Sequence, residues 1–167
     1  MRSFQLITLF VAGLLLSSCG VYTFSGASIS PEVMSFSVQY FSNRAQLVQP
    51  LLSPTFTEKL KQRMLSLAGL RQTDQDGDLQ FEGYISDYRN TPTAIQGSQT
   101  AALNRLSISV TVKFTNTKDV KQNFETTFTR YADYDSKVAF ESVEQNLIEE
   151  ISRQLIDDIF NKSVSNW

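Results

Sequence analysis

Few side chains in this chain of 167 residues could do chemistry. The sequence holds one cysteine, Cys19, and no histidine. Without imidazole, the Ser-His-Asp and Cys-His nucleophilic units and the commonest zinc ligand are excluded. The sequence also lacks a Gly-x-Ser-x-Gly motif, a Ser-x-x-Lys motif and a phosphate-binding glycine loop. These observations predict a protein that is not an enzyme and carries no cofactor.

The spacing of one acidic cluster can be compared with that of a calcium-binding loop. Asp74, Asp76 and Asp78 in TDQDGDLQFE begin like a calcium-binding loop. The sixth position of such a loop is a glycine and the twelfth a bidentate glutamate, but Leu79 and Ile85 stand there. We therefore expect an acidic turn that leads into a strand. No pair of carboxylates stands out for glycoside cleavage either.

Cys19 lies where a lipid anchor would be attached. Arg2 precedes an apolar run, residues 6–16, which has the length of a secretory h-region and is too short to span a bilayer. The Leu-Ser-Ser-Cys that ends at Cys19 resembles the bacterial lipobox. That resemblance implies cleavage before Cys19 and acylation of its thiol, and two or three acyl chains make a stable anchor. A non-lipidated signal, or an uncleaved signal anchor with a chance cysteine, stays open.

Composition limits the partners and the architecture. The chain carries 15 basic and 17 acidic residues, a formal net charge of −2, so it has no basic field for nucleic acid. With Cys19 acylated, no disulfide can form. We divide the chain into a signal peptide (1–18), a lipidated tether (19–31) and a single domain (32–167), a length suited to one core.

Hydrophobic periodicity predicts four strands and two helices. The first strand covers 33–41, with Met34, Phe36, Val38 and Tyr40 on its apolar face, and 42–50 is expected to be a loop. A helix begins near Ser53, has Pro54 in its first turn and ends near a Gly69 C-cap. Its apolar stripe consists of Phe56, Leu60, Met64 and Leu67.

The second half reads as three strands and a long helix. Strands are expected over 79–86, over 106–114 and from 124 onward, with the hairpin turn at 117–122. In the last strand, strict alternation would bury Arg130 and expose Tyr131, so we expect a bulge there. The closing helix covers about 138–163. Its apolar stripe consists of Phe140, Val143, Leu147, Ile151, Leu155 and Ile159, and is widened by Ile148, Ile156 and Phe160.

The order β-α-β-β-β-α predicts an α+β fold of two layers, a four-stranded sheet with both helices packed on one face. The other face would be rich in hydroxyl groups and poor in charge, and neutral groups lose less than ions on desolvation. We expect it to face a partner, although a plain solvated sheet stays open. A fifteen-residue uncharged loop, Asn90–Asn104, would adjoin it. The predicted partner-facing residues are Tyr84, Ser86, Tyr88, Ser107, Ser109, Thr111, Lys113 and Thr127.

After the lipobox, five segments follow in order: CGVYTFSGASI, FSVQYFSNRAQLVQPLLSPTFTEKLKQRM, GDLQFEGYISDYRNTPTA, NRLSISVTVKFTN and IEEISRQLIDDIFNKSVSNW. Together they resemble the LptE family, the lipopolysaccharide-assembly lipoproteins of Gram-negative outer membranes. The resemblance implies a β-α-β-β-β-α domain anchored to the outer membrane. It also implies a partner, the LptD β-barrel, in which the domain stands as a plug, and a role in assembling that barrel.

The resemblance further implies contact with lipopolysaccharide, whose phosphates favour basic side chains. No basic cluster is apparent, and the candidates are Arg89, Arg105 and Lys113. For each of them a solvated surface charge is the alternative. A lipoprotein adaptor of another envelope machine, for barrel assembly or cell-wall synthesis, also stays open as a function.

Overall fold

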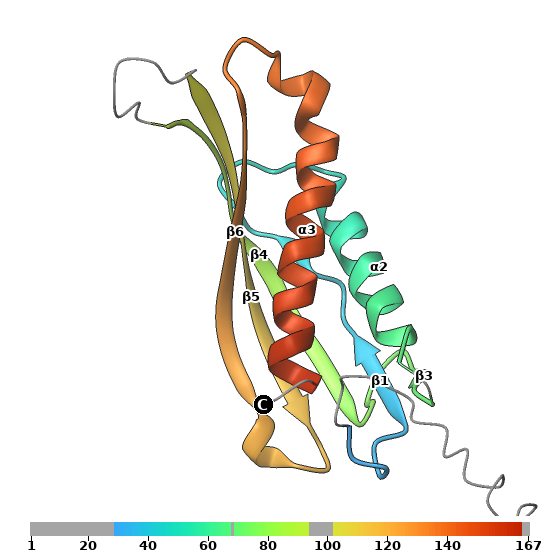
Figure 1. The fold of residues 1–167 in the computed structure, drawn as a ribbon. Coiled ribbons are helices and arrows are strands. Elements are labelled where there is room, and N and C mark those ends of the chain that lie inside the picture. The colour runs from blue at the N-terminus through green and yellow to red at the C-terminus, as the bar shows by residue number, and fades with distance from the viewer. Residues whose placement is uncertain (1–28, 68, 94–101, 165–167) are drawn as a thin grey trace, which may run out of the picture.

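The chain folds into two layers, a mixed sheet and a pair of helices that lie side by side on one face of it (Figure 1). This computed structural model describes residues 29–67, 69–93 and 102–164. Cys19, the predicted signal peptide and most of the predicted tether lie outside the described residues. So does the middle of the predicted uncharged loop.

The sheet has six strands where four were predicted. In chain order the elements are β1 (Ser35–Val38), β2 (Ser42–Asn43), α2 (Leu52–Leu65), β3 (Arg71–Gln72), β4 (Leu79–Pro92), β5 (Leu103–Asn116), the short 3-10 turn η1 (Val120–Gln122), β6 (Phe124–Asp135) and α3 (Phe140–Val164). The strand order is β3-β1-β4-β5-β6, with β2 beside β4. The two extra strands, β2 and β3, have two residues each, too few to show an alternation.

The first strand is shorter than its sequence pattern. Phe36 and Val38 are buried as predicted, but Met34 and Tyr40 are 57% and 61% exposed. β1 ends at Val38, so Tyr40 lies beyond the ladder. β1 runs parallel to β4 and β3, while β4, β5 and β6 form an antiparallel meander.

Both helices bury the stripes that their sequences predict. Phe56, Leu60 and Met64 of α2 are fully buried, and so are Ile151, Leu155 and Ile159 of α3. The C-cap of α2 is Ser66, whereas Gly69 was predicted. Gly69 lies further along, in the turn towards β3, where its φ of +88° is one that glycine adopts without strain.

The bulge lies in β4, and the one predicted near Arg130 is absent. The register of β4 against β5 shifts between Ile85 and Asp87, while β5 and β6 pair without a shift. Arg130 does lie on the helix side of β6. It stays exposed there, and its guanidinium donates two hydrogen bonds, of 2.6 and 2.7 Å, to Asp158 of α3.

The two long strands also shorten the predicted loop. β4 continues to Pro92 and β5 starts at Leu103, so both ends of the Asn90–Asn104 segment are paired strand. Midway along β4, Gly83 permits the close approach of β5. A Cβ atom there would lie 2.1 Å from the carbonyl oxygen of Thr111 and 2.6 Å from the ring of Phe41.

Candidate partner-binding face

The face of the sheet opposite the helices is the candidate binding surface, and we call it the open face. In the described ranges, no helix lies on it (Figure 1). The register places Tyr84, Ser107, Ser109, Thr111, Lys113 and Thr127 on this face, as predicted from alternation. Whether these residues contact a partner is a separate question, which their placement leaves as a prediction.

The centre of the open face is made of paired hydroxyl groups. The hydroxyl oxygens of Ser109 and Thr129 lie 2.8 Å apart, and those of Thr111 and Thr127 lie 2.9 Å apart. Ser109 and Thr111 are each 9% exposed, since they are short side chains on β5, which is flanked by β4 and β6. The centre is therefore neutral, and its hydroxyl groups already have partners.

Towards both ends of the open face, three basic side chains are held by carboxylates, whereas Arg44 lies over the Tyr84 ring. The ammonium of Lys113 lies 2.9 Å from Glu82, and Arg89 lies 2.6 Å from Asp87. Arg105 donates two hydrogen bonds, of 2.7 and 2.8 Å, to Asp133. Its guanidinium carbon also stands 3.6 Å from the centroid of the Tyr131 ring.

These ion pairs set the electrostatics of the surface. The hydrogen bonds from Arg105 lower the pKa of Asp133, and the bond to Glu82 raises the pKa of Lys113. In each pair the two opposite charges lie about 3 Å apart or less. The paired part of the open face thus presents little net field to a partner.

Tyr88 was predicted on the open face and lies on the helix side instead. The bulge adds Ser86 to β4 without a partner in β5, which reverses the alternation from Asp87 onward. Tyr88 is 6% exposed, and its hydroxyl donates a 2.5 Å hydrogen bond to Glu144 of α3. Burial and this bond raise the pKa of Tyr88.

The same reversal brings Asp87 and Arg89 onto the open face, where sequence analysis did not expect charge. The three cations named for lipopolysaccharide do not form one cluster. Arg105 and Lys113 stand eight residues apart on β5, about 27 Å along an extended strand. Arg89 and Arg105 are neighbours, since their partners across the ladder are Ser107 and Thr91.

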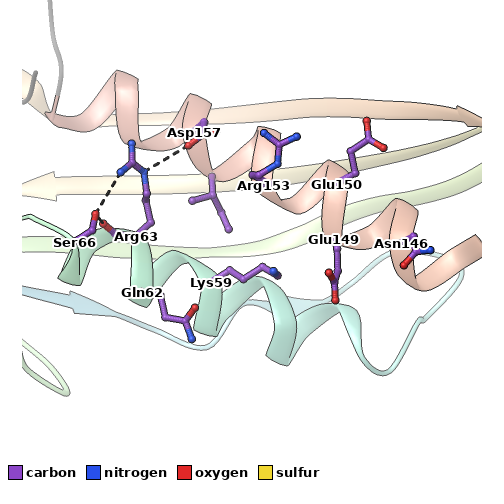
Figure 2. Close-up of a pocket in the computed structure, with 10 residues that line it drawn as sticks. Lys59, Gln62, Arg63, Ser66, Asn146, Glu149, Glu150, Arg153 and Asp157 are labelled. Carbon is purple, nitrogen blue, oxygen red and sulfur yellow. Dashed lines mark hydrogen bonds and ion pairs between the residues drawn. The ribbon is translucent and has the colours of Figure 1, made fainter.

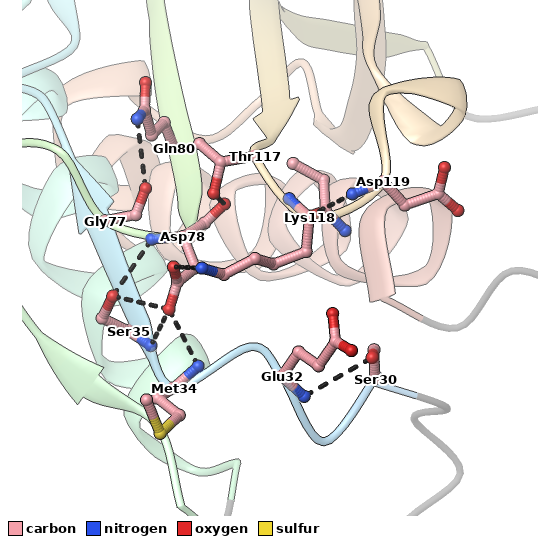
Figure 3. Close-up of polar contacts among 11 residues, drawn as sticks. Ser30, Glu32, Met34, Ser35, Gly77, Asp78, Gln80, Thr117, Lys118 and Asp119 are labelled. Carbon is pink, nitrogen blue, oxygen red and sulfur yellow. Dashed lines mark hydrogen bonds and ion pairs between the residues drawn. The ribbon is translucent and has the colours of Figure 1, made fainter.

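Asp78 has a role that sequence analysis missed, at the end of the sheet where the chain enters β1 (Figure 3). Its carboxylate accepts hydrogen bonds from the Met34 and Ser35 amides and from the Ser35 hydroxyl, at 2.9–3.1 Å. Lys118 forms an ion pair with it at 3.0 Å. These donors, the Met34 amide first, lower the pKa of Asp78 to about 2. The expected acidic turn is confirmed, and Asp78 joins it to β1 and to the β5–β6 hairpin.

A second concave surface lies between the two helices (Figure 2). This groove has a volume of about 600 Å³ and is lined by Lys59, Gln62, Arg63, Ser66, Asn146, Glu149, Glu150, Arg153, Ile156 and Asp157. The three basic side chains are matched by three acidic ones. Arg63 stacks on Phe160 at 3.8 Å and lies 3.5 Å from Asp157. The balance of charge indicates no particular class of ligand.

The described residues contain neither a metal-binding cluster nor a membrane-spanning helix. No group of three or more Asp, Glu, Cys or His side chains is arranged to hold a metal ion there. In the same residues, no helix is long and apolar enough to cross a membrane.

Comparison with known families decides the classification. The family model of LptE, described as lipopolysaccharide-assembly, matches residues 33–163. The chain belongs to the LptE family. The match covers β1 through α3, so the LptE domain includes both helices, the whole sheet and its open face. No curated protein matches this LptE chain in sequence.

Solved structures share the fold at low identity. The hypothetical protein CT253 of Chlamydia trachomatis is 11% identical, with a TM-score of 0.54 over 79% of this chain and 98% of that one. A homologue of neuraminyllactose-binding hemagglutinin from Helicobacter pylori is 8% identical, with a TM-score of 0.53 over 84% and 88%. A minor lipoprotein of Acinetobacter baumannii is 14% identical, with a TM-score of 0.49 over 79% and 96%. At such identities the first two likenesses bear on the fold alone.

Proposed function

We propose that this LptE-family protein is a lipid-anchored, non-catalytic subunit of the outer-membrane lipopolysaccharide translocon. In this proposal the domain stands inside the LptD β-barrel as a plug and assists assembly of the barrel. Membership of a lipopolysaccharide-assembly family supports a role in lipopolysaccharide transport. Acyl chains on Cys19 would hold the domain at the periplasmic side of the outer membrane.

The observation that carries the plug proposal is the self-paired, neutral centre of the open face. The lumen of a large barrel is polar. A surface whose hydroxyl groups pair with one another, as Ser109 does with Thr129 and Thr111 with Thr127, can lose its water at small cost. The ion pairs of Lys113 and Arg105 would likewise bring little net charge into the lumen.

Contact with lipopolysaccharide remains a prediction. Arg89 is the most accessible of the three named cations, because its side chain is 66% exposed and its carboxylate partner, Asp87, is a near neighbour on the same strand. Arg105 is held by both Asp133 and the Tyr131 ring. A lipid phosphate would therefore reach Arg89 with the least rearrangement.

Substitution at Thr111 tests the plug proposal. Thr111→Arg and Thr111→Val both remove the hydroxyl pair with Thr127, but only arginine adds bulk and charge to the open face. We expect Thr111→Arg to fold and to reduce LptD recovery at least tenfold when the tagged protein is purified from outer membranes. Thr111→Val should reduce recovery much less, because it only leaves the Thr127 hydroxyl without its partner. As a control on the helix side, Gln145→Arg should recover LptD as the wild type does.

The outcomes separate the candidate functions. Normal LptD recovery by Thr111→Arg would show that the open face is not the interface. Recovery of a barrel-assembly or cell-wall machine by the wild-type protein, in place of LptD, would favour the adaptor function.

The anchor needs its own test. Cys19→Ser should block acylation and leave an unprocessed precursor, visible by mass spectrometry. A Cys19→Ser chain that is still cut before residue 19 and fractionates with the outer membrane would disprove lipidation at this position.

A further inference from the structure

The two edges of the sheet differ in the length of their strands. On one side stand β3 and β1, strands of two and four residues, and β2 adds two residues beside β4. The other side is β6, which pairs with β5 over twelve residues without a bulge (Figure 1). Proteins commonly protect edge strands with bulges, proline, lysine or short length. β6 is long and has no bulge, proline or lysine, and the one charge that it directs to the helix side, Arg130, is paired with Asp158.

The hydrogen bonds show which backbone groups of β6 point outward. At one end of β5 the Thr93 amide donates to the Leu103 carbonyl, and at the other end the Thr117 amide donates to the Asp78 carbonyl, both at 2.9 Å. The odd-numbered residues of β5 therefore direct their backbone N–H and C=O groups towards β4, and the even-numbered residues direct theirs towards β6. The register pairs even residues with even, as in Leu106 with Ala132.

The odd-numbered residues of β6 must then direct their N–H and C=O groups away from β5. These residues are Glu125, Thr127, Thr129, Tyr131 and Asp133, and all five are exposed. Among the residues that the structure describes, no strand pairs with this edge. Five amides and five carbonyls thus form a regular, accessible row.

Side chains on either side of this row indicate what would fit it. On the helix side, Phe124 and Phe128 are partly buried and pack edge to face, 6.2 Å apart. On the open face stand the hydroxyls of Thr127 and Thr129 and the carboxylate of Glu125. Glu125 joins none of the ion pairs found in the described residues.

We propose that the outer edge of β6 is a strand-addition site that takes one extended segment of the partner protein. The inference rests on the proposed function, since it takes that partner to be the β-barrel. The segment would place apolar side chains over Phe124 and Phe128, and hydroxyl or basic side chains along the open face, a basic one opposite Glu125. Backbone bonds would supply the affinity and this alternation the specificity.

A lone segment fits this edge better than a second copy of the chain. α3 reaches out to β6, since Asp158 holds Arg130 and the Lys162 ammonium lies 5.0 Å from the Phe124 ring. Paired strands lie about 4.8 Å apart, whereas packed helices need about 8–10 Å between axes. A second sheet joined here with its helices on the same face would have to pack its own α3 against the first, whereas a lone segment brings no helix.

Amide exchange in the mature full-length lipoprotein tests the site directly. The protein is measured by NMR in detergent, alone and in the complex purified with the barrel. Alone, the amides of Thr127, Thr129 and Tyr131 should exchange almost as fast as in an unfolded chain. In the complex they should exchange about 100-fold more slowly, while the amides of Thr126 and Phe128 are protected in both states.

A proline substitution gives an independent test. Proline lacks an N–H, and at Thr127 it removes one that the fold does not use. Thr127→Val is the matched control because it also loses the hydroxyl bond to Thr111 but keeps the amide. We expect Thr127→Pro to speed dissociation of the barrel at least tenfold more than Thr127→Val does, because the valine variant measures the loss of the hydroxyl alone. If circular dichroism shows that Thr127→Pro is unfolded, the exchange measurement decides.

The contrary outcomes are distinct. A purified complex in which the odd-numbered amides still exchange fast overturns the strand-addition site and leaves the plug proposal standing. Failure of the wild-type protein to recover a barrel overturns both. Slow exchange in the isolated chain also overturns the site. It would indicate a second copy if it depends on concentration, and the chain's own residues 20–28 if it does not.

Discussion

The two faces of the sheet are built from alternate residues of the same strands, yet they contribute to the protein in different ways. On β5, Ile108, Val110 and Val112 point to the helices and are fully buried. Between them, Ser109 and Thr111 point to the open face and bond to hydroxyls of β6. On the helix side, stability depends on shape and volume. On the open face, contacts are pairwise and can be exchanged for contacts with another surface.

This difference predicts how substitutions should behave. A change on the helix side should lower the free energy of unfolding, whatever partner is present. A change on the open face should leave the isolated domain nearly intact and act on the complex. Single substitutions can test this contrast between the two faces.

Gly83→Val should have the largest effect. Gly83 stands between Phe81 and Ile85 on the helix side of β4, where a Cβ would collide with the backbone of Thr111 and the ring of Phe41. Because a backbone carbonyl cannot move aside without opening the ladder, we expect a loss of about 4 kcal/mol or more, or failure to fold. Urea unfolding followed by circular dichroism measures this.

Gly69→Ala is the matched control for Gly83→Val. Gly69 also needs its glycine, but for its φ of +88°, and nothing lies within 4 Å of the added atom. Its cost should be about 1 kcal/mol. Equal effects at the two glycines would contradict the close approach of β4 and β5 at Gly83.

Asp78 is the polar exception on the open-face row of β4, because its contacts hold the fold together. Its folded pKa of about 2 lies below the ordinary 3.8, so the charged form stabilises the native state. That contribution is complete above about pH 4 and disappears as pH falls towards 2. With partial screening by water, we expect a loss of about 1–2 kcal/mol over that range.

Asp78→Asn isolates this contribution. The amide keeps the size of the side chain but cannot replace the carboxylate that Met34, Ser35 and Lys118 share. The variant should be less stable at pH 7 by a similar amount, and its stability should vary less between pH 4 and pH 2. An unchanged acid profile in the variant would assign the acid sensitivity to other carboxylates.

The long helices and strands could be predicted from the sequence because their apolar residues recur with a regular period. The stripes of α2 and α3 and the alternation of β5 each repeat over several turns or pairs, and the structure confirms them. β2 and β3 left no such signal, since two residues cannot alternate. Their pairing depends on where β1 and β4 bring the chain, which is a long-range effect.

The candidate site was predictable in its centre and less so at its ends. Ser109 and Thr111 follow from the alternation of one regular strand. Tyr88 was predicted on the wrong face of the sheet, because the sequence from Ile85 to Tyr88 fits an unbroken alternation equally well. The bulge was expected instead at Arg130, whose charge on the helix side appeared unfavourable. Asp158, a distant residue on α3, satisfies that charge, and no local pattern could indicate it.

Lys113→Gln should have the smallest effect on the isolated domain and completes the contrast. Lys113 is 57% exposed and pairs with Glu82 across the β4–β5 ladder, at the end of the open face near η1. Exposed pairs of this kind contribute about 0–1 kcal/mol, because water and salt screen both charges. We therefore expect the urea midpoint of the free domain to stay nearly unchanged, at low salt and in 1 M salt alike. In the complex, however, Glu82 would be left without its partner against a surface that excludes water, where an unpaired charge is costly. Lys113→Gln should therefore weaken recovery of the barrel while leaving the free domain stable. A large loss of stability in the free domain, with normal recovery of the barrel, would reverse the roles assigned to the two faces.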